Sequence, residues 1–237
     1  MNNKEIILIP AYEPDDKLLK LVENLSKEEF DVVIVDDGSG TLYKEIFNKC
    51  EGIATVISYD ENQGKGYALK TGFKYIKDNY KEPYIIVTMD CDGQHTIKDA
   101  KKLIRECSKD RSALYLGKRV RSGKTPIRSR IGNAITRIVY RLVANLDVYD
   151  TQTGLRVFSD ELIDYMLDIE GNRFEYEMNV LLSCAKDKVK IKEIEIETIY
   201  INNNSGSHFD GLKDSYRIYR DIFKFVFKKK VINKVIN

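Results

Sequence analysis

Acidic residues follow short hydrophobic segments at three places in the first half of the chain: Glu13, Asp36, Asp37, Asp90 and Asp92. If those segments are parallel strands, their carboxyl ends meet at one edge of a sheet, where open α/β sheets bind their ligands. Carboxylates gathered at one edge repel each other unless a cation lies among them. Oxygen ligands of this kind favour Mg²⁺ or Mn²⁺, which retain water and bridge to substrate phosphates. The pattern therefore predicts a divalent-cation site.

The segment after the hydrophobic run at residues 84–89 is the main candidate for this cation site. Asp90 and Asp92 are separated by one residue, and Gln94 and His95 add a further oxygen or nitrogen ligand. The earlier Asp-Asp-Gly-Ser segment is more ambiguous, because Asp and Ser also favour turns and helix caps. For that segment, a structural role and a binding role both stay open.

Two further groups of residues are suited to phosphate. Residues 62–66 (Asn-Gln-Gly-Lys-Gly) carry two glycines before a helical pattern, which allows a phosphate to approach the start of a helix. Gly66 stands where a Walker A motif has Ser or Thr, so a turn and helix start is the favoured interpretation. Arginine binds phosphate through two parallel hydrogen bonds. We predict this role for Arg119, and a solvated helix face for Arg137 and Arg141.

The spacing of hydrophobic residues predicts the elements that position these groups. Short runs rich in Ile and Val alternate with helical patterns, which indicates a mostly parallel sheet flanked by helices. The predicted strands cover residues 6–9, 32–35, 54–58, 84–89, 113–116 and 189–201. The predicted helices cover residues 15–26, 66–77, 98–108, 128–146, 175–185 and 211–228. We expect a single α/β domain.

Composition excludes several classes of protein. The 237 residues include 39 Lys and Arg against 37 Asp and Glu, a net charge of +2, which is too balanced for a general polyanion binder. No apolar run reaches the roughly 18–20 residues that cross a bilayer. Four Cys show neither zinc nor disulfide spacing, which indicates reduced thiols. We expect no nucleic-acid partner, no integral membrane protein and a cytoplasmic location.

Seven sequence blocks, taken in order, resemble the family 2 glycosyltransferases, and within them polyprenyl-phosphate sugar transferases like dolichyl-phosphate mannose synthase. The blocks are Pro-Ala-Tyr at 10–12, Asp-Asp-Gly-Ser at 36–39, Asn-Gln-Gly-Lys-Gly-Tyr-Ala at 62–68, Asp-Cys-Asp-Gly-Gln-His at 90–95, Asp-Thr-Gln-Thr-Gly-Leu-Arg at 150–156, Phe-Glu-Tyr-Glu at 174–177 and Gly-Ser-His-Phe at 206–209. Cys91 and Ile196 depart from the family, where Ala and Pro are usual. No segment matches the transmembrane helices that many members carry after the catalytic domain.

The resemblance implies a GT-A fold, a Rossmann-like and mostly parallel sheet flanked by helices, and a nucleotide-diphosphate sugar as donor. The implied donor-binding residues are Pro10, Ala11, Tyr12, Glu13, Asp36, Asp37, Lys65 and Asp90. The implied ligands of an Mg²⁺ or Mn²⁺ cofactor are Asp90, Asp92 and Gln94. The implied contacts of an acceptor phosphate are Arg119, Arg128, Ser129 and Arg130. One domain at 1–237 would then comprise a nucleotide-sugar-binding half (1–117), an acceptor half (118–210) and a C-terminal amphipathic basic helix (211–237).

The chemistry implied is inverting transfer of a hexose from the donor to an acceptor. A cation held at Asp92 stabilises the diphosphate leaving group as a Lewis acid. A polyprenyl phosphate is already an anion and needs no strong base, whereas a hydroxyl acceptor needs a carboxylate to take its proton. Asp150 is the predicted base for a hydroxyl, ahead of Glu175 and Glu177. We predict Asp92 and Asp150 as catalytic residues and a polyprenyl phosphate as the acceptor.

Three alternatives remain beside this hypothesis. In the first alternative, the donor is the same, but the acceptor is a hydroxyl of a saccharide or of the cell envelope. A phosphohydrolase of the haloacid dehalogenase type shares the Asp-x-Asp-Gly fragment at 90–93, but that fragment normally follows the first strand and three strands precede it here. A non-catalytic subunit would have lost the cation ligands, and this chain retains them.

The C-terminal segment combines an aromatic and aliphatic stripe with basic residues. The stripe has helical spacing and consists of Tyr216, Tyr219, Ile222, Phe223, Val226 and Phe227, followed by Lys228, Lys229 and Lys230. Core packing is one interpretation, and a basic amphipathic helix on an anionic membrane is the other. A membrane subunit is a further candidate partner for the same surface. Peripheral attachment to the cytoplasmic face of the membrane is therefore an alternative to a purely cytoplasmic location.

Overall fold

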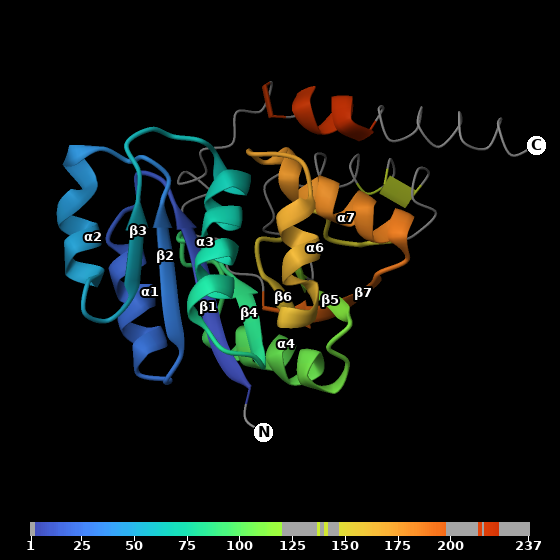
Figure 1. The fold of residues 1–237 in the computed structure, drawn as a ribbon, viewed down its shortest axis with the longest axis horizontal. Helices are drawn as coiled ribbons and strands as arrows, with labels where there is room; N and C mark the ends of the chain where they lie inside the picture. Colours follow the sequence, from blue (N-terminus) through green and yellow to red (C-terminus); the bar gives the residue numbers. More distant parts are fainter. Residues whose placement is uncertain are drawn as a thin grey trace, which may run out of the picture.

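A seven-stranded sheet with the order β3-β2-β1-β4-β6-β5-β7 forms the centre of the molecule (Figure 1). The computed structural model describes residues 3–119, 137, 140–141, 147–197, 213–214 and 216–222. The strands are β1 (Lys4–Ala11), β2 (Asp31–Asp36), β3 (Thr55–Ser58), β4 (Tyr84–Thr88), β5 (Ala113–Arg119), β6 (Arg156–Ser159) and β7 (Lys190–Ile196). The helices are α1 (Lys17–Ser26), α2 (Lys44–Cys50), α3 (Lys65–Asn79), α4 (Ile97–Lys109), α6 (Ile163–Asp168) and α7 (Glu175–Asp187), with 3-10 turns η1 (Thr41–Tyr43) and η2 (Asp160–Leu162).

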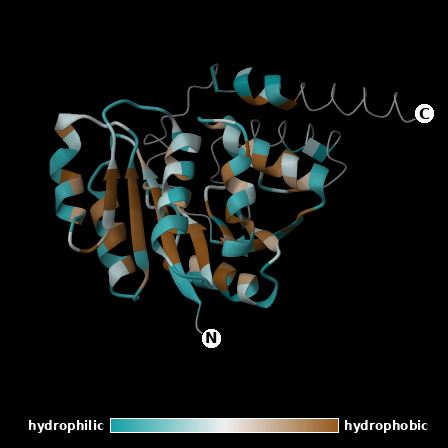
Figure 2. Ribbon diagram, viewed as in Figure 1, coloured by the Kyte–Doolittle hydropathy of each residue, from teal (hydrophilic) through white to brown (hydrophobic). Residues whose placement is uncertain are grey.

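The two faces of the sheet are covered by different helices. Successive side chains of a strand point to opposite faces, so in β1 Ile7 packs with α1, α2 and α4, while Ile6 packs with α3, α6 and α7. Figure 2 shows the resulting pattern of hydrophobic strands enclosed by helices with hydrophilic outer surfaces. The fold is a single α/β domain with a mostly parallel sheet, as the sequence predicts.

Helix α4 illustrates why the local sequence adopts its structure. Its buried residues Ala100, Leu103, Ile104 and Cys107 recur at helical spacing. At its start, the Thr96 hydroxyl accepts the backbone N–H of the third helical residue at 3.0 Å, which satisfies one donor that the helix leaves unpaired. The following loop delivers β5 to the sheet beside β6 and β7.

Strand β6 is antiparallel to both of its neighbours and was not predicted. In the sheet it lies between β4 and β5, which the sequence predicts as consecutive strands. Its four residues begin with a buried Arg156, whose Nε donates to the carbonyl of Thr153 and whose Nη1 donates to the carbonyl of Glu177. A charged residue in so short a strand hides the hydrophobic pattern on which strand prediction depends.

Several predicted boundaries differ from the observed ones. The predicted strand at 189–201 is wrong in its extent, because β7 ends at Ile196 and residue 197 is irregular. The short helices α2 and α6 were also missed. Residues 137, 140–141, 213–214 and 216–222 are helical, which agrees with the helices expected there. Arg128, Ser129 and Arg130 lie outside the described residues, as do residues 198–212 and 223–237.

The parallel strands end at one edge of the sheet, as expected. Ala11 of β1 is paired with Asp36 of β2, and Leu8 is paired with Thr88 of β4, so the segments after these strands meet. The helical residues 213–214 and 216–222, drawn in red in Figure 1, lie above this edge. Within the described ranges, no helix is both long enough and apolar enough to cross a membrane. The four cysteines are all free thiols.

Candidate active site

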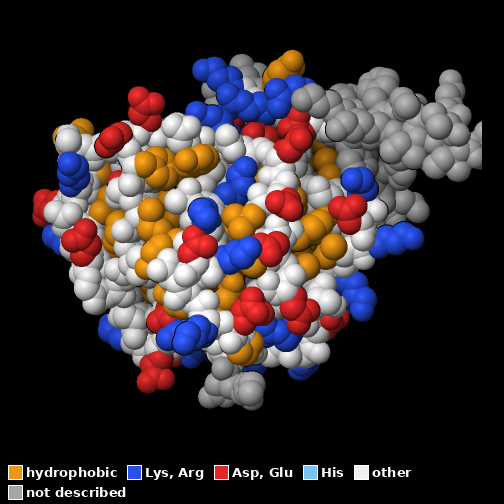
Figure 3. Space-filling view, in the orientation of Figure 1, with side chains coloured by type: hydrophobic (Ala, Val, Ile, Leu, Met, Phe, Trp, Pro, Cys, Tyr) orange, Lys and Arg blue, Asp and Glu red, His pale blue; other side chains and the backbone are white. Residues whose placement is uncertain are grey.

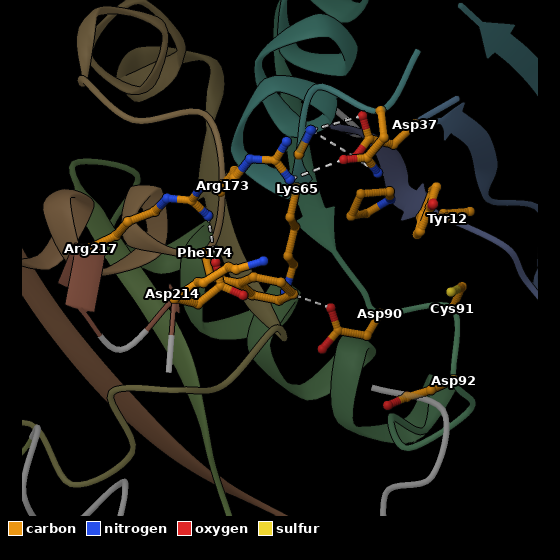
Figure 4. Close-up of a pocket in the computed structure, with 15 residues that line it drawn as sticks. Tyr12, Asp37, Lys65, Asp90, Cys91, Asp92, Arg173, Phe174, Asp214 and Arg217 are labelled. Carbon is orange, nitrogen blue, oxygen red and sulfur yellow. Dashed lines mark hydrogen bonds and ion pairs between the residues drawn. The ribbon is translucent and has the colours of Figure 1, made fainter. Parts of the chain in front are cut away.

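A pocket of about 520 Å³ lies beyond the ends of β1, β2 and β4 (Figure 4). It is lined by Pro10, Ala11, Tyr12, Asp37, Asn62, Gly64, Lys65, Asp90, Cys91, Asp92, Arg173, Phe174, Lys213, Asp214 and Arg217. Most of the residues predicted to bind the donor are therefore brought together. Glu13 and Asp36 are not among the lining residues, and the contacts of these two residues explain why.

Asp36 and Glu13 shape the turns that follow β2 and β1. The Asp36 carboxylate accepts the backbone N–H of Ser39 at 2.9 Å. The Ser39 hydroxyl in turn accepts the backbone N–H of Glu13 at 2.8 Å. This is the turn role that the sequence leaves open for the Asp-Asp-Gly-Ser segment. A direct contact of Glu13 or Asp36 with the donor stays a prediction.

Asp37 holds the loop that precedes α3. Its buried carboxylate accepts hydrogen bonds from the Tyr59 hydroxyl at 2.7 Å and the Asn62 amide at 3.0 Å. It also accepts the backbone N–H groups of Gln63 at 2.9 Å and Gly64 at 2.9 and 3.0 Å. These N–H groups face Asp37 and are not directed at a phosphate. Asp37 thus positions the edge of the pocket, and its predicted contact with the donor is additional to this role.

Replacing Asp37 with Asn is expected to destabilise the protein by about 2 kcal/mol. An amide has one acceptor oxygen, so at least one buried donor of the loop loses its partner, and hydrogen bonds to charged groups contribute in this range. Urea unfolding followed by circular dichroism measures the change. Asp60→Asn is the matched control in the same loop, because Asp60 is exposed. Equal stabilities of the two variants would contradict this role for Asp37.

The two glycines before and within the start of α3 are explained by close packing against residues 172–176. Gly64 has φ +104°, and a Cβ there would overlap the side chain of Arg173. A Cβ on Gly66 would lie 2.5 Å from the Cβ of Tyr176. The helix begins at Lys65, as the predicted turn and helix start requires, and a phosphate contact of this loop stays a prediction.

A chain of alternating charges crosses the floor of the pocket. Lys65 Nζ lies 2.8 Å from Asp90 Oδ1 and 3.0 Å from Glu177 Oε2, and Arg156 Nε lies 3.7 Å from Glu177 Oε1. Burial disfavours the charged form of Asp90, but Lys65 and His95 outweigh it and lower the pKa of Asp90 well below its ordinary range. Burial likewise opposes the charge of Lys65, yet Asp90 and Glu177 raise its pKa above the ordinary value. Both groups are therefore charged near neutral pH.

Asp92 has surroundings that suit an added positive charge. Burial, and next the charge of Asp90, raise the pKa of Asp92. One of its oxygens accepts the backbone N–H of Gln94 at 3.0 Å. Burial and both carboxylates raise the pKa of Cys91 to about 12, so this thiol stays protonated and is a poor metal ligand. Within the described ranges, no three His, Cys, Asp or Glu side chains form a metal cluster. Asp90 and Asp92 line the pocket and Gln94 does not, so Gln94 as a ligand stays a prediction. Two carboxylates fit an ion that takes its other ligands from water and substrate phosphates.

Asp150 and Arg119 form an ion pair beside this floor. Arg119 Nε lies 2.6 Å from Asp150 Oδ2, and Arg119 Nη2 lies 3.0 Å from Asp150 Oδ1. The backbone N–H of Asp150 donates to Glu193 at 2.9 Å, which fixes the start of the 150–156 loop. Later in that loop, a Cβ on Gly154 would overlap the Asp90 carboxylate. The predicted base and the predicted phosphate ligand are thus partners of each other.

The family model described as glycosyl transferase family 2 matches residues 6–166, which is more than half of the chain. The chain belongs to this family. An uncharacterized protein of Methanocaldococcus jannaschii is 33% identical over 236 residues, which cover 97% of this chain and 94% of that protein. The family assignment confirms that the protein is a glycosyltransferase that uses a nucleotide sugar. It removes the phosphohydrolase alternative.

Other relatives of this family 2 glycosyltransferase have named activities. The UDP-N-acetylglucosamine–dolichyl-phosphate N-acetylglucosaminyltransferase of Methanococcus voltae is 29% identical over 82% of this chain and 85% of its own length. The dolichyl-phosphate beta-glucosyltransferase of Saccharomyces cerevisiae is 28% identical over 91% of this chain and 72% of its own length. The relatives of this chain therefore include members of the polyprenyl-phosphate branch, which the sequence blocks resemble.

The GT-A fold is shown by a solved structure. Glucosyl-3-phosphoglycerate synthase from Mycobacterium tuberculosis, in complex with Mn²⁺, UDP and phosphoglyceric acid, superposes with a TM-score of 0.67 at 14% identity. The match covers 96% of this chain and 78% of the synthase. At this identity the likeness concerns the fold alone.

Five lining residues of this glycosyltransferase escape sequence reasoning: Arg173, Phe174, Lys213, Asp214 and Arg217. The first two precede α7, and the last three belong to a helix more than 100 residues from the Asp-Cys-Asp motif. The sequence places Phe174 in a family block without a role, and it treats the C-terminal helix as core or membrane surface. The one signal of a charged face there is the spacing of Lys213 and Arg217, which are four positions apart and so lie on the same side of a helix.

Proposed function

We propose that this glycosyltransferase transfers a hexose, with inversion, from a nucleotide-diphosphate sugar to a polyprenyl phosphate. The observation that carries the proposal is that each carboxylate considered as a base is already bonded within the chain. Asp150 is held by Arg119, and Glu177 by Lys65. Glu175 Oε1 accepts the backbone N–H of Asn172 at 3.1 Å, while its Oε2 is buried and has no hydrogen-bond partner among the described residues. A carboxylate held in this way is poorly placed to take a proton from a hydroxyl, whereas an anionic acceptor requires no such base.

The named relatives support the same acceptor class, since two of them act on dolichyl phosphate by name. A saccharide or cell-envelope hydroxyl is the alternative acceptor. It would require Asp150 to leave Arg119 and act as the base. Peripheral contact with the cytoplasmic face of a membrane, directly or through a membrane subunit, is a part of the proposal that follows from a lipid acceptor.

A divalent cation, Mg²⁺ or Mn²⁺, would be held by Asp90, Asp92 and Gln94, and it would offset the negative charge that grows on the leaving diphosphate. Tyr12, with Pro10 and Ala11 beside it, would bind the base and ribose of the donor. Asp37 keeps the neighbouring loop in place. Lys65 holds the Asp90 carboxylate in a fixed orientation through their ion pair.

On the acceptor side, Arg119 would bind the lipid phosphate, together with Arg128, Ser129 and Arg130. Asp150 orients the Arg119 guanidinium through its two hydrogen bonds. Fixed cations of this kind bring the anionic acceptor close to the anionic donor and reduce their repulsion. Asp150 then acts on the reaction by positioning Arg119.

A matched pair of acceptors tests the proposal. The enzyme is incubated with Mn²⁺, a panel of UDP-, GDP-, CDP- and dTDP-hexoses, and either a short polyprenyl phosphate or the polyprenol of the same length. We expect a glycolipid from the phosphate and none from the alcohol. The proton coupling at the anomeric carbon of the product reports inversion.

Three outcomes would contradict the proposed function. Equal transfer to the polyprenol would show that the site activates a hydroxyl. Transfer to saccharides with no transfer to the lipid phosphate would favour the alternative acceptor. Retention of the anomeric configuration would exclude a single in-line displacement.

A further inference from the structure

The pocket is lined by four basic and four acidic residues, so the pairing of each basic residue decides which of them is available to a ligand. Its four cationic residues are Lys65, Arg173, Lys213 and Arg217. Lys65 is balanced by Asp90 and Glu177. The two arginines come from different parts of the chain and have other surroundings. Their contacts decide what they are suited to bind.

Arg173 faces the pocket without a carboxylate partner within the part of the chain that the structure describes. Its Nη1 donates to the Asn62 side-chain carbonyl at 3.1 Å, a neutral acceptor. Its backbone N–H donates to Glu175 Oε1 at 3.2 Å, which fixes the main chain immediately before α7. The close approach of Gly64 confines the stem of the side chain. The guanidinium is thus oriented but not neutralised.

Arg217 reaches the pocket from the helical residues 216–222. Ile218 and Ile222 of this helix are 7% and 1% exposed and pack in the hydrophobic core beside α3 and α7. The same helix also carries the half-buried Arg217, whose Nη1 lies 2.9 Å from Asp214 Oδ1. Figure 3 shows Lys and Arg side chains gathered over this segment at the top of the molecule. Ile218 and Ile222 anchor the helix in the core, and Asp214 orients the Arg217 guanidinium.

Two arginines and two carboxylates face the pocket from different sides. In Figure 4, Arg173 and Arg217 lie on one side of the pocket, and Asp90 and Asp92 lie on the other. A cation bound by the two carboxylates and a pair of guanidinium groups would enclose an anion from both sides. Planar guanidinium groups bind the paired oxygens of phosphates through two hydrogen bonds.

We propose that Arg173 and Arg217 bind the diphosphate of the donor on the side opposite Asp90 and Asp92. The pair would also stabilise the nucleoside diphosphate as it leaves, because its negative charge increases when the sugar departs. This inference rests on the proposed function, since it assumes a nucleotide-diphosphate sugar as the donor. It extends that function by adding two residues from segments outside the sequence motifs that predict donor binding.

The test compares nucleoside diphosphates with monophosphates by isothermal titration calorimetry on the full chain with Mn²⁺. The probes are UDP, GDP, CDP, ADP and dTDP, and the tightest of them is then paired with its own monophosphate. The variants are Arg173→Gln and Arg217→Gln. The control is Arg220→Gln, because Arg220 lies on the same helix, pairs with Asp221 at 2.9 Å and does not line the pocket.

We expect each of the two variants to bind the diphosphate about tenfold more weakly or worse, which corresponds to losing one charge-assisted contact. Monophosphate binding should change little, and Arg220→Gln should bind both as the wild type does. Arg173→Lys and Arg217→Lys keep the charge but lose the planar fork, so they should recover part of the affinity. Recovery of this kind separates charge recognition from a loss of structure.

Three results would overturn the inference. The first is unchanged diphosphate affinity in both glutamine variants. The second is an equal loss for diphosphate and monophosphate, which would mean that the arginines act on the nucleoside or on folding. The third is unchanged nucleotide binding with a raised KM for the polyprenyl phosphate, which would assign the pair to the acceptor. If the wild type binds none of the five diphosphates, the proposed function fails and the inference fails with it.

Discussion

Asp92→Asn is expected to abolish sugar transfer while the protein remains folded. Asp92 lies in the pocket next to Asp90, and neutralising it removes one of the two carboxylates proposed to hold the cation. Loss of one group that stabilises charge in a transition state costs about 10²–10³-fold in rate, and loss of a cation ligand should reach at least this range. Initial rates of glycolipid formation at saturating Mn²⁺ measure the effect.

The same substitution should not lower the thermal stability of the metal-free protein. Burial and Asp90 raise the pKa of Asp92, so the folded state disfavours the charged carboxylate more than the unfolded chain does. Above the raised pKa this difference reduces stability, and an amide removes it. We expect the Tm of Asp92→Asn in chelator at pH 7 to equal or exceed that of the wild type. The difference should vanish below the ordinary pKa of Asp, near about 4.

Asp78→Asn is the control for both measurements, because Asp78 is exposed on α3 and pairs only with Lys74 within the described ranges. It should leave activity and Tm unchanged. Full activity of the wild type in excess chelator, or substantial activity of Asp92→Asn, would refute the proposed role of the cation. A large fall in Tm would show that Asp92 acts mainly on folding.

Lys65→Met is expected to destabilise the protein by about 3 kcal/mol. The substitution leaves Asp90 and Glu177 facing each other without their shared cation. Removing one partner of a buried ion pair costs about 3–5 kcal/mol, and the lower end applies because Asp90 is 31% exposed. For a chain of this size the Tm should fall by roughly 6–12 °C. Differential scanning calorimetry in chelator measures it.

The loss of stability in Lys65→Met relative to the wild type should become smaller as the pH falls. Because Lys65 lowers the pKa of Asp90 in the folded wild type, the resulting stability is present above the ordinary pKa of Asp, about 4, and is lost as the pH falls through the lowered value. The wild type and Lys65→Met should therefore converge as the pH falls below about 4. A constant deficit across this range would contradict the assignment.

Lys74→Met provides the matched control for Lys65→Met. Lys74 lies on the same helix, its side chain is 73% exposed, and its pair with Asp78 is of the surface kind. We expect a change of about 0.5 kcal/mol or less. A similar loss in both variants would mean that the Asp90–Lys65–Glu177 cluster contributes no more than a surface ion pair.

The fold was predictable where hydrophobic runs are long and regular. The runs in β1, β2 and β4 are buried on both faces, so their patterns are strong and their carboxyl ends were placed correctly. Strand β6 was missed because Arg156 opens it and its neighbours in the sheet run antiparallel to it. Its buried guanidinium is compensated by carbonyls from the loop and from α7, a contact that only tertiary structure supplies.

Site residues that directly follow a predicted strand could be predicted. Site residues that distant segments contribute through tertiary packing could not. Tyr12, Asp37, Asp90 and Asp92 line the pocket as expected. The sequence does not reveal that Asp150 is held by Arg119, because nothing in the spacing of residues 31 positions apart indicates an ion pair. Arg173 reaches the pocket through the packing of Gly64 against it, so its position depends on a tertiary contact.

The antiparallel direction of β6 has a consequence for how substrate preference can be exchanged between relatives. Because β6 runs against β4, the 150–155 segment reaches the site before its strand begins, whereas the motifs after β1, β2 and β4 reach it after theirs. The motifs before residue 118 and the 150–155 segment thus belong to separate stretches of the chain, and a chimera joined near residue 118 would also divide the proposed diphosphate contacts Arg173 and Arg217 from the carboxylates opposite them. Such a graft succeeds only if Gly154 is retained, because any larger residue would displace the Asp90 carboxylate at the seam.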